Sequence, residues 1–366
     1  MAENDDSMLM LGIESSCDET SVALLNGEGE VRANLIASQI ERHQPFGGVV
    51  PEIASREHLD NLMPLMRKAL ADSGKALGDV TAVSVTCGPG LIGALLVGVA
   101  AAQGLAYGLG IPLIPVNHLE GHVFSPFLRS DGSARALPPR FFSLVVSGGH
   151  SSVYEVTADG EQRSIRMLNR TRDDAAGEVF DKVGKFVGLP YPGGPHIEKT
   201  AKEGDPERFR FPLARFKDDS VDFSFSGLKS NAIRLARQLG LEAAAGGDGS
   251  GSQVLADFCA SFQKAIGDQI LDRLGKLWDS RERASRPALL ALAGGVAANG
   301  DLRERIGSWC SERGVEALLP ERRYCTDNAA MIAFAGLQRW RSGEVSGDPR
   351  RVPAYSRMPL GASDER

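Results

Sequence analysis

The feature that most constrains the fold of this chain is an order of elements that occurs twice. The first copy begins with strands at Met8–Glu14, Thr20–Leu25 and Val31–Ser38. A helix at Pro51–Leu70, a strand at Val80–Cys87, a helix at Gly90–Gly108 and a strand at Ile111–Val116 follow. The second has strands at Phe141–Ser147, Ser151–Thr157, Ser164–Leu168 and Ala288–Ala293, and helices from Asp173 and Gly194 and at Asn299–Arg313 and Asp327–Arg341. The repetition predicts an α/β chain of two related lobes with a ligand cleft between them.

The length of 366 residues suits two domains of about 150 residues each. We expect an N-terminal lobe at 8–137 and a C-terminal lobe at 138–341, with an insertion around 200–252. Part of that insertion, Ala243–Ser252, has the composition of a surface loop. Residues 342–366 are polar with scattered prolines, and we expect a loose tail there.

Charge and cysteine content limit the classes of protein. The net charge of −6 excludes nucleic-acid binding by bulk charge, so any RNA contact needs a local basic face or a partner. The five cysteines form no C-x-x-C pair, which favours buried thiols in a reducing, cytoplasmic compartment. Glycines interrupt the longest apolar stretch, 91–109, so we predict a buried helix and no membrane span.

Glycine and small polar residues follow several predicted strands. Backbone N–H groups in such turns converge on phosphate oxygens, and a helix start adds a favourable dipole. Each motif alone is as well explained by an ordinary turn, but four in a duplicated α/β chain favour a nucleotide cleft. No G-x-x-x-x-G-K-[ST] motif is present, which excludes a P-loop enzyme. The motifs are Gly12–Thr20, Thr86–Gly93, Val145–Ser152 and Leu292–Asn299.

His118 and His122 are four residues apart on a predicted helix, so their imidazoles share one face and reach a single metal ion. Two surface histidines explain the pair equally well. A zinc peptidase of the H-E-x-x-H type needs Glu directly after the first histidine, where this chain has Leu119. Glu120 is expected to point away from the metal face, which disfavours a peptidase.

The best candidate for a third ligand is Asp327, which precedes a predicted helix. The alternative role for Asp327 is to cap that helix, and the two roles are compatible. A site of two imidazoles and one carboxylate suits iron or zinc better than magnesium.

From about Leu9 to Trp340 the chain resembles the universal tRNA threonylcarbamoyltransferase family, whose members were formerly called sialoglycoprotein endopeptidases. The resemblance rests on GIESSCDETSVALL, GGVVPEIASREHL, GPGLIGALLVG, HLEGH, VSGGH, DDAAGEVFDKVGKFVGLPYPGGP, DFSFSGLK, AGGVAANGDLR and CTDNAAMIAFAG. It is closest to the bacterial catalytic subunit. It implies two lobes of the actin-like ATPase, or ribonuclease-H-like, fold. It also implies transfer of a threonylcarbamoyl group from threonylcarbamoyl-AMP to the exocyclic amine of the adenosine 3′ to the anticodon, in tRNAs reading ANN codons.

The resemblance also implies roles for particular residues. His118, His122 and Asp327 match the metal ligands of the family, for one divalent ion per subunit. Its substrate contacts match Val145, Val146, Ser147, Gly148, Gly149, Asp181, Gly194 and Asn299. ATP or ADP is a further expected occupant of the cleft. The implied partners are tRNA, a same-fold paralogue lacking the metal site, a small P-loop ATPase and an upstream threonylcarbamoyl-AMP synthase. The helix 51–70 is a candidate docking face or a core helix.

Two roles rest on the residues themselves. The attacking amine must lose a proton, and Asp18 and Glu19 at a strand end are candidates for a catalytic base or an orienting group. Surface turn carboxylates are an equally good explanation. The stretch Lys199–Arg237 is the most basic part of the chain and alternates with phenylalanines, which favours tRNA contact or, equally, a solvated face over core aromatics. The alternative to a transferase is an ATP-dependent scaffold or switch subunit of the same complex.

Overall fold

A computed structural model describes residues 8–218, 220–242 and 252–361 of the chain. These residues form two compact units. The first comprises the described residues up to Pro139, Val156–Arg166 and those from Pro320 onward, and the second comprises Arg140–Glu155 and Met167–Leu319. The lobe boundaries at 137 and 341 stay a prediction, as does the cleft. Most of the predicted loop Ala243–Ser252 lies outside the described residues.

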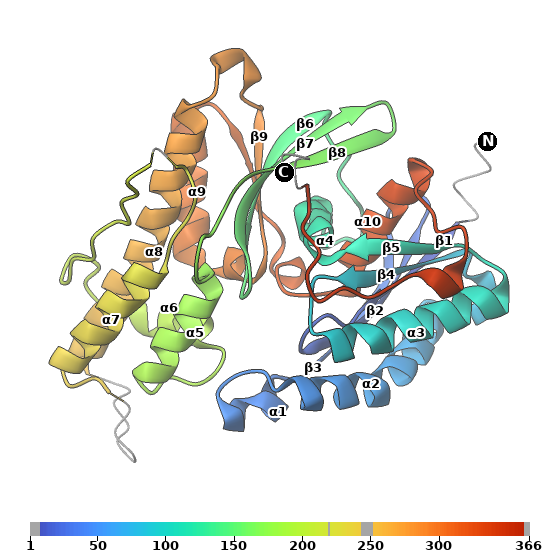
Figure 1. The fold of residues 1–366 in the computed structure, drawn as a ribbon, viewed down its shortest axis with the longest axis horizontal. Coiled ribbons are helices and arrows are strands. Elements are labelled where there is room, and N and C mark those ends of the chain that lie inside the picture. Colours follow the sequence, from blue (N-terminus) through green and yellow to red (C-terminus); the bar gives the residue numbers. More distant parts are fainter. Residues whose placement is uncertain (1–7, 219, 243–251, 362–366) are drawn as a thin grey trace. The chain divides into compact units, whose positions relative to one another are not determined.

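The described residues contain two five-stranded sheets with the same strand order, one in the first unit and one mainly in the second (Figure 1). The first order is β3-β2-β1-β4-β5, and the second, reversed, is β8-β7-β6-β9-β10. In each sheet the first strand pairs in parallel with the fourth, and the fourth with the fifth. This shared topology confirms the predicted duplicated α/β class. The strands are β1 Leu9–Glu14, β2 Glu19–Asn26, β3 Val31–Ser38, β4 Ala82–Gly88, β5 Leu113–Asn117, β6 Arg140–Val146, β7 Ser151–Asp159, β8 Gln162–Arg170, β9 Leu289–Ala293 and β10 Glu316–Leu318.

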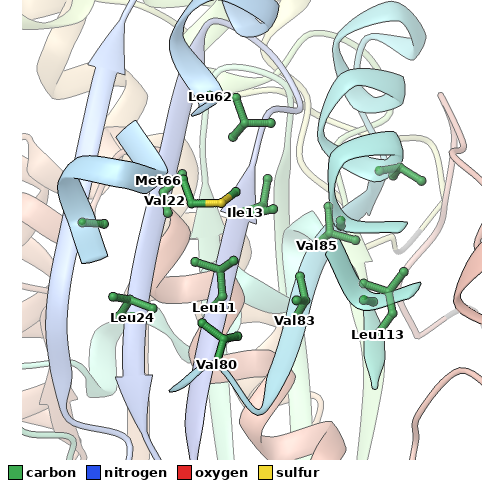
Figure 2. Packing of buried hydrophobic residues seen from close by; sticks show 14 of the residues in the cluster. Leu11, Ile13, Val22, Leu24, Leu62, Met66, Val80, Val83, Val85 and Leu113 are labelled. Atoms are coloured by element: carbon green, nitrogen blue, oxygen red, sulfur yellow. The ribbon is translucent and has the colours of Figure 1, made fainter. Parts of the chain in front are cut away.

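Helices cover both faces of the first sheet. Leu11, Ile13 and Val22 point from β1 and β2 into a core shared with α2 (Pro51–Asp72) and α3 (Ile92–Leu109), as Figure 2 shows. Because side chains alternate along a strand, Gly12 faces the other way, toward α10 (Ala329–Arg341). A Cβ on Gly12 would lie 2.5 Å from the Ala329 carbonyl oxygen, so only glycine allows this close packing.

The apolar helix α3 is long and hydrophobic enough to cross a membrane by length and composition alone. It packs beside α2 and against β4, with Ala94, Leu95 and Val99 buried. Its other side exposes Ile92 and Leu96. Thus α3 is half core helix and half apolar surface, where the sequence analysis predicts full burial.

Helices α5 to α9 belong to the second unit. Two of them were not predicted, α7 (Ser226–Gln238) and the 27-residue α8 (Gln253–Asp279). The Ser252 hydroxyl caps α8 by accepting a hydrogen bond from the backbone N–H of Leu255, a start signal that the sequence displays. The remaining helices are α5 Ala176–Phe186, α6 Gly193–Ala201 and α9 Gly300–Glu312.

The segment that follows α10 lies against the first unit, where the sequence analysis expects a loose tail. The Tyr355 N–H donates to the Cys87 carbonyl at 2.7 Å, and the Asn117 side chain donates to the Met358 carbonyl at 2.9 Å. Val352 and Leu360 are buried. These hydrogen bonds and the buried side chains of Val352 and Leu360 therefore hold the C-terminal segment beside the ends of β4 and β5.

Candidate metal centre and ligand loops

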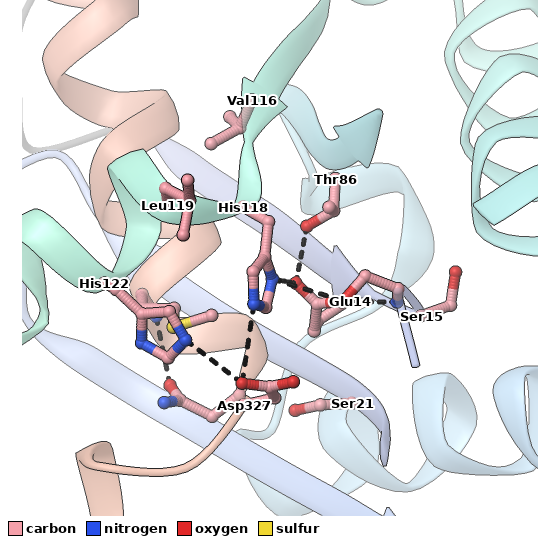
Figure 3. A network of polar contacts seen from close by, with 12 residues as sticks. Glu14, Ser15, Ser21, Thr86, Val116, His118, Leu119, His122 and Asp327 are labelled. Atoms are coloured by element: carbon pink, nitrogen blue, oxygen red, sulfur yellow. Dashed lines mark hydrogen bonds and ion pairs between the residues drawn. The ribbon is translucent and has the colours of Figure 1, made fainter. Parts of the chain in front are cut away.

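The three predicted metal ligands lie together in the first unit (Figure 3). The Nε2 atoms of His118 and His122 lie 3.5 Å and 3.1 Å from Asp327 Oδ1, and all three ligand atoms fall within 4.8 Å of one another. Both histidines are on α4 (His118–Phe124), whereas Asp327 is more than 200 residues away along the chain. A group of two imidazoles and one carboxylate fits a divalent metal ion.

Two helix caps hold this arrangement. The Asn117 side chain accepts a hydrogen bond from the Leu119 N–H and so begins α4 directly before His118. Asn328, not Asp327, caps α10, because its side chain accepts from the Met331 N–H. The alternative capping role considered for Asp327 is therefore taken by its neighbour, and the Asp327 carboxylate faces the imidazoles.

The buried nitrogens of His122 test whether the cluster suits a metal. The side chain of His122 is fully buried, and across the described residues neither ring nitrogen forms a hydrogen bond of acceptable geometry: Nε2 only approaches Asp327 Oδ1 at 3.1 Å, and Nδ1 has no hydrogen-bond partner. An unpaired buried polar atom is costly, and metal binding at Nε2 would satisfy it. Burial disfavours the charged form of His118, but the carboxylates of Asp327 and Glu14 outweigh this effect and raise its pKa to about 9. The cluster thus attracts positive charge.

Glu120 takes no part in the cluster. Its buried carboxylate forms a two-pronged ion pair with Arg339 of α10, at 3.0 Å and 2.8 Å from Nε and 2.7 Å from Nη2. Glu120 therefore points away from the metal face, as predicted, and joins the helix of the two histidines to the helix that follows Asp327. A carboxylate held in this way is not available as the base of a peptidase.

The sequence analysis missed Glu14, the last residue of β1. Its side chain is fully buried, and its Oε2 lies 3.0 Å from His118 Nδ1. The signal was present, because an acidic residue ends a strand whose other residues are all buried. By the strand period, Glu14 shares its face with Gly12, on the side of α10.

Asp18 and Glu19 lie at the start of β2 in the same unit. Asp18 is buried, and Glu19 accepts a hydrogen bond from the Ser38 hydroxyl at 3.3 Å. Burial, together with the negative charges of Asp18 and Asp327, raises the pKa of Glu19 well above its usual range. These side chains are thus not ordinary surface turn carboxylates. The electrostatic coupling of Glu19 to Asp327 indicates a place for this carboxyl group near the metal ligands.

His58 of α2 holds the turn between β1 and β2. Its Nε2 lies 2.9 Å from the Cys17 carbonyl oxygen and its Nδ1 lies 2.7 Å from the Thr20 hydroxyl. Because a carbonyl only accepts, Nε2 carries the proton and Nδ1 accepts from Thr20. A buried, neutral imidazole therefore fixes the turn that carries Asp18 and Glu19.

This arrangement predicts a loss of stability in mild acid. Burial is the largest influence on the pKa of His58 and lowers it below the ordinary 6.5. As pH falls below about 6.5 the unfolded chain takes up the proton first, so the free energy of unfolding declines until the folded pKa is reached. Urea titrations between pH 7.5 and 5 are expected to show this decline, and His58→Gln to flatten it. An equally steep decline in His58→Gln would contradict the assignment.

The predicted substrate loop lies at the end of β6 in the second unit. Val145 and Val146 are strand residues with buried side chains, so only their backbone can face a ligand. Gly148 and Gly149 are exposed, and a Cβ at either would meet nothing within 4 Å. The turn is closed by the His150 N–H, which donates to the Ser147 hydroxyl at 3.2 Å. Thus Gly148 and Gly149 are the accessible part of the motif, and Ser147 is buried beneath them.

Other glycine-rich segments converge on this loop within the second unit. A Cβ on Gly177 would lie 2.7 Å from the Ser147 carbonyl, and one on Gly294 would lie 2.4 Å from the Val146 carbonyl. The ends of β6 and β9 and the start of α5 therefore form one corner, built by close backbone approach. Such a corner suits a phosphate-containing ligand.

Asp181, Gly194 and Asn299 belong to the helices around that corner. Asp181 of α5 accepts a hydrogen bond from the Gly193 N–H at 2.7 Å, which joins α5 to the start of α6, next to Gly194. Asn299 caps α9 by accepting from the Leu302 N–H, and its amide donates to Gln263 at 2.8 Å. Each polar side chain thus has a structural partner, and its substrate role stays a prediction.

The basic stretch 199–237 contains exposed cationic side chains and buried phenylalanines. Arg208, Arg210 and Lys217 are exposed, whereas Phe223 and Phe225 are fully buried. Phe211 packs edge-on against aromatic rings of α8, and Phe216 contacts the guanidinium groups of Arg172 and Arg273. The aromatic side chains mainly belong to the core, whereas these three cations are exposed.

Comparison with known proteins identifies the family. A sequence profile of the TsaD family, described as tRNA N6-adenosine threonylcarbamoyltransferase, matches residues 30–334. The enzyme of that name from Moorella thermoacetica is 49% identical, covering 96% of this chain and 97% of its own length. The one from Syntrophobacter fumaroxidans is 44% identical, covering 96% and 99%.

Solved structures support the fold alone. Full-length HypF in a phosphate- and nucleotide-bound form aligns with a TM-score of 0.57 at 11% identity, over 94% of this chain and 48% of that one. The actin-like, ribonuclease-H-like class expected from the sequence is thereby confirmed. Because the family profile spans more than half of the chain and the curated relatives match nearly end to end, this chain belongs to the TsaD family of tRNA N6-adenosine threonylcarbamoyltransferases.

Proposed function

We propose that this chain transfers a threonylcarbamoyl group from threonylcarbamoyl-AMP to the exocyclic amine of the adenosine 3′ to the anticodon, in tRNAs reading ANN codons. The observation that carries the proposal is the His118, His122 and Asp327 cluster in a member of this family. A nucleotide switch has no need of such a cluster. An anticodon-loop adenosine is single-stranded, so it reaches a pocket without the opening of a duplex.

The reaction joins the amine to the carbamoyl carbon while AMP leaves, so charge develops on carbonyl and phosphate oxygens. His118, His122 and Asp327 would hold one divalent metal ion, iron or zinc, which supplies positive charge for oxygen atoms when bound. The backbone of Val145–Gly149 is suited to donate N–H groups to the acyl-phosphate. Asp181 and Asn299 would contact ribose or base, and Gly194 would allow close approach. We propose ATP or ADP as a further ligand of this chain.

The amine loses a proton as it attacks, and Asp18 and Glu19 are the proposed acceptor or orienting groups. Glu19 is electrostatically coupled to Asp18 and to the proposed ligand Asp327, which supports a role for these carboxyl groups beside the metal ligands. The Glu19 carboxylate is partly accessible, whereas Asp18 is buried. We therefore propose this pair of carboxyl groups as the proton acceptor and the orienting group.

We propose three protein partners in a cytoplasmic setting: a same-fold paralogue lacking the metal site, a small P-loop ATPase and an upstream threonylcarbamoyl-AMP synthase. The exposed apolar side chains of α2 and α3, Leu59, Met63, Ile92 and Leu96, would form the docking face for the paralogue. The two helices adjoin, since a Cβ on Gly93 would lie 3.4 Å from Ser55. Apolar patches of this kind mark protein interfaces.

The test is reconstitution. The full chain, with the three partners, tRNA, threonine, bicarbonate and ATP, is incubated, and the nucleosides of the digested tRNA are separated by liquid chromatography and identified by mass. Formation of threonylcarbamoyladenosine that depends on this chain supports the proposal. Its formation at the same rate with a chain that cannot hold metal would favour the scaffold or switch function instead.

We also propose that the exposed cations around Arg208 contact tRNA. Reversal of charge in Arg208→Glu with Arg210→Glu is expected to weaken tRNA binding about tenfold or more at low salt and to lower the salt dependence by about one phosphate contact per residue. Filter binding across salt concentrations measures both quantities. Arg350→Glu with Arg351→Glu, at exposed positions of the C-terminal segment, changes the net charge by the same amount and is the control. Unchanged affinity at low salt would contradict the proposed surface.

A further inference from the structure

We propose that Glu14 is a positioning residue of the metal centre, which fixes the His118 imidazole so that Nε2 faces the metal. The inference rests on the proposed metal site and deepens it. Glu14 contacts the proposed metal ligand His118 and does not bind the metal ion itself. The inference rests on one observation: the fully buried Glu14 carboxylate contacts one ring nitrogen of His118, and Asp327 contacts the other.

The two ring nitrogens of His118 face two different carboxylates. Nδ1 lies 3.0 Å from Glu14 Oε2, and Nε2 lies 3.5 Å from Asp327 Oδ1. Figure 3 shows the ring between them. The Ser16 hydroxyl also lies 3.2 Å from Nδ1 and can either accept from it or donate to it, whereas an ionised carboxylate only accepts. The bond to Glu14 therefore requires the proton on Nδ1 and leaves the Nε2 lone pair for a metal.

Glu14 is itself held on both oxygens. The Thr86 hydroxyl of β4 donates to Oε2 at 2.6 Å, and the Ser16 N–H donates to Oε1 at 2.5 Å. The ion-pair partner of the carboxylate in the described part of the chain is His118. A buried carboxylate is expensive to desolvate unless it has such donors and a positive neighbour. The arrangement thus favours a cation beyond the imidazole.

His122 provides an internal contrast. Its Nδ1 has no hydrogen-bond partner among the described residues, so nothing there selects its tautomer. Only His118 has the carboxylate support that metal-binding histidines usually have. Loss of that support in other metal sites weakens metal binding about 10–100-fold, and we expect an effect of this size for Glu14.

The variant Glu14→Gln tests the inference with little change of shape. If the glutamine oxygen accepts from Ser16, its amide nitrogen donates toward His118 Nδ1 and favours the tautomer that blocks Nε2. The opposite orientation places two donors against each other at Ser16. Glu155→Gln is the matched control, since Glu155 is also buried and paired, with Arg140, but lies in the second unit. It undergoes the same chemical change away from the cluster.

Zinc affinity of the full chain is measured by competition with a chromophoric chelator, and folding by circular dichroism. We expect Glu14→Gln to bind Zn²⁺ about 10–100-fold more weakly than the wild type and Glu155→Gln to bind it equally well. A folded Glu14→Gln chain with wild-type affinity overturns the inference but leaves the metal site intact. Absence of zinc binding by the wild type overturns the metal site of the proposed function as well.

A second measurement needs no variant, in case Glu14→Gln fails to fold. In the zinc-loaded wild-type chain with ¹⁵N-labelled histidine, long-range proton–nitrogen spectra report which nitrogen of each ring carries the proton. We expect Nδ1–H and metal-bound Nε2 for His118. A His118 ring bound through Nδ1, with the proton on Nε2, overturns the inference.

Discussion

His118→Ala is expected to lower threonylcarbamoyl transfer by about 10³-fold or more and to abolish stoichiometric metal retention. The substitution removes one of three ligands and leaves His122 and Asp327, too few to hold a divalent ion firmly. Charge stabilisation by a bound metal is worth several kcal/mol, and about 1.4 kcal/mol corresponds to each tenfold in rate. The reconstituted assay gives the rate, and elemental analysis of the dialysed chain gives the metal content.

A control must separate loss of metal from loss of fold. Circular dichroism and urea titration of His118→Ala are compared with those of metal-free wild type, because both lack the ion. His122→Ala is expected to give the same loss of activity through a different side chain of α4. Wild-type transfer by a folded His118→Ala chain that retains no metal would refute the metal role and favour the scaffold function.

The second large effect concerns stability. Arg339→Ala is expected to lower the free energy of unfolding by about 3–5 kcal/mol at pH 7.5, because it leaves the buried Glu120 carboxylate without its counter-ion. Burial already raises the pKa of Glu120, and Arg339 counteracts that rise. Without Arg339 the pKa rises further. A group whose pKa is higher in the folded than in the unfolded protein stabilises the fold at low pH, and this contribution is lost as pH increases. The difference in unfolding free energy between Arg339→Ala and the wild type should therefore shrink toward pH 5.

Urea titrations at pH 7.5 and 5 measure this deficit. Arg341→Ala is the matched control, in the same last turn of α10, where the side chain donates to the Gly27 carbonyl and its loss is expected to cost about 1 kcal/mol. Glu120→Met combined with Arg339→Met should recover much of the loss, because it removes both charges together. A deficit below 1 kcal/mol in Arg339→Ala would contradict the structural role of the pair.

The predictable part of the fold follows from periodicity. The strand and helix spacing around Leu11, Ile13 and Leu62 gave the correct type for most elements, because one face of each element is buried. The helix α8 was not predicted, because it follows a stretch with the composition of a surface loop, although Ser252 marks its start. The C-terminal segment was interpreted as loose from its polarity, since hydrogen bonds such as that from Asn117 to Met358 depend on distant residues.

The candidate site divides in the same manner. The sequence by itself determined the family and placed the imidazoles of His118 and His122 on one helix face, with Asp327 as the candidate third ligand. Motif identity and helical spacing are local properties of the chain. Only the tertiary structure decided that Asn328 caps α10, that Glu120 pairs with Arg339 and that Glu14 supports His118. These contacts depend on the order of strands in the sheet and on how the helices pack against it. Local sequence specifies neither the strand order nor the helix packing.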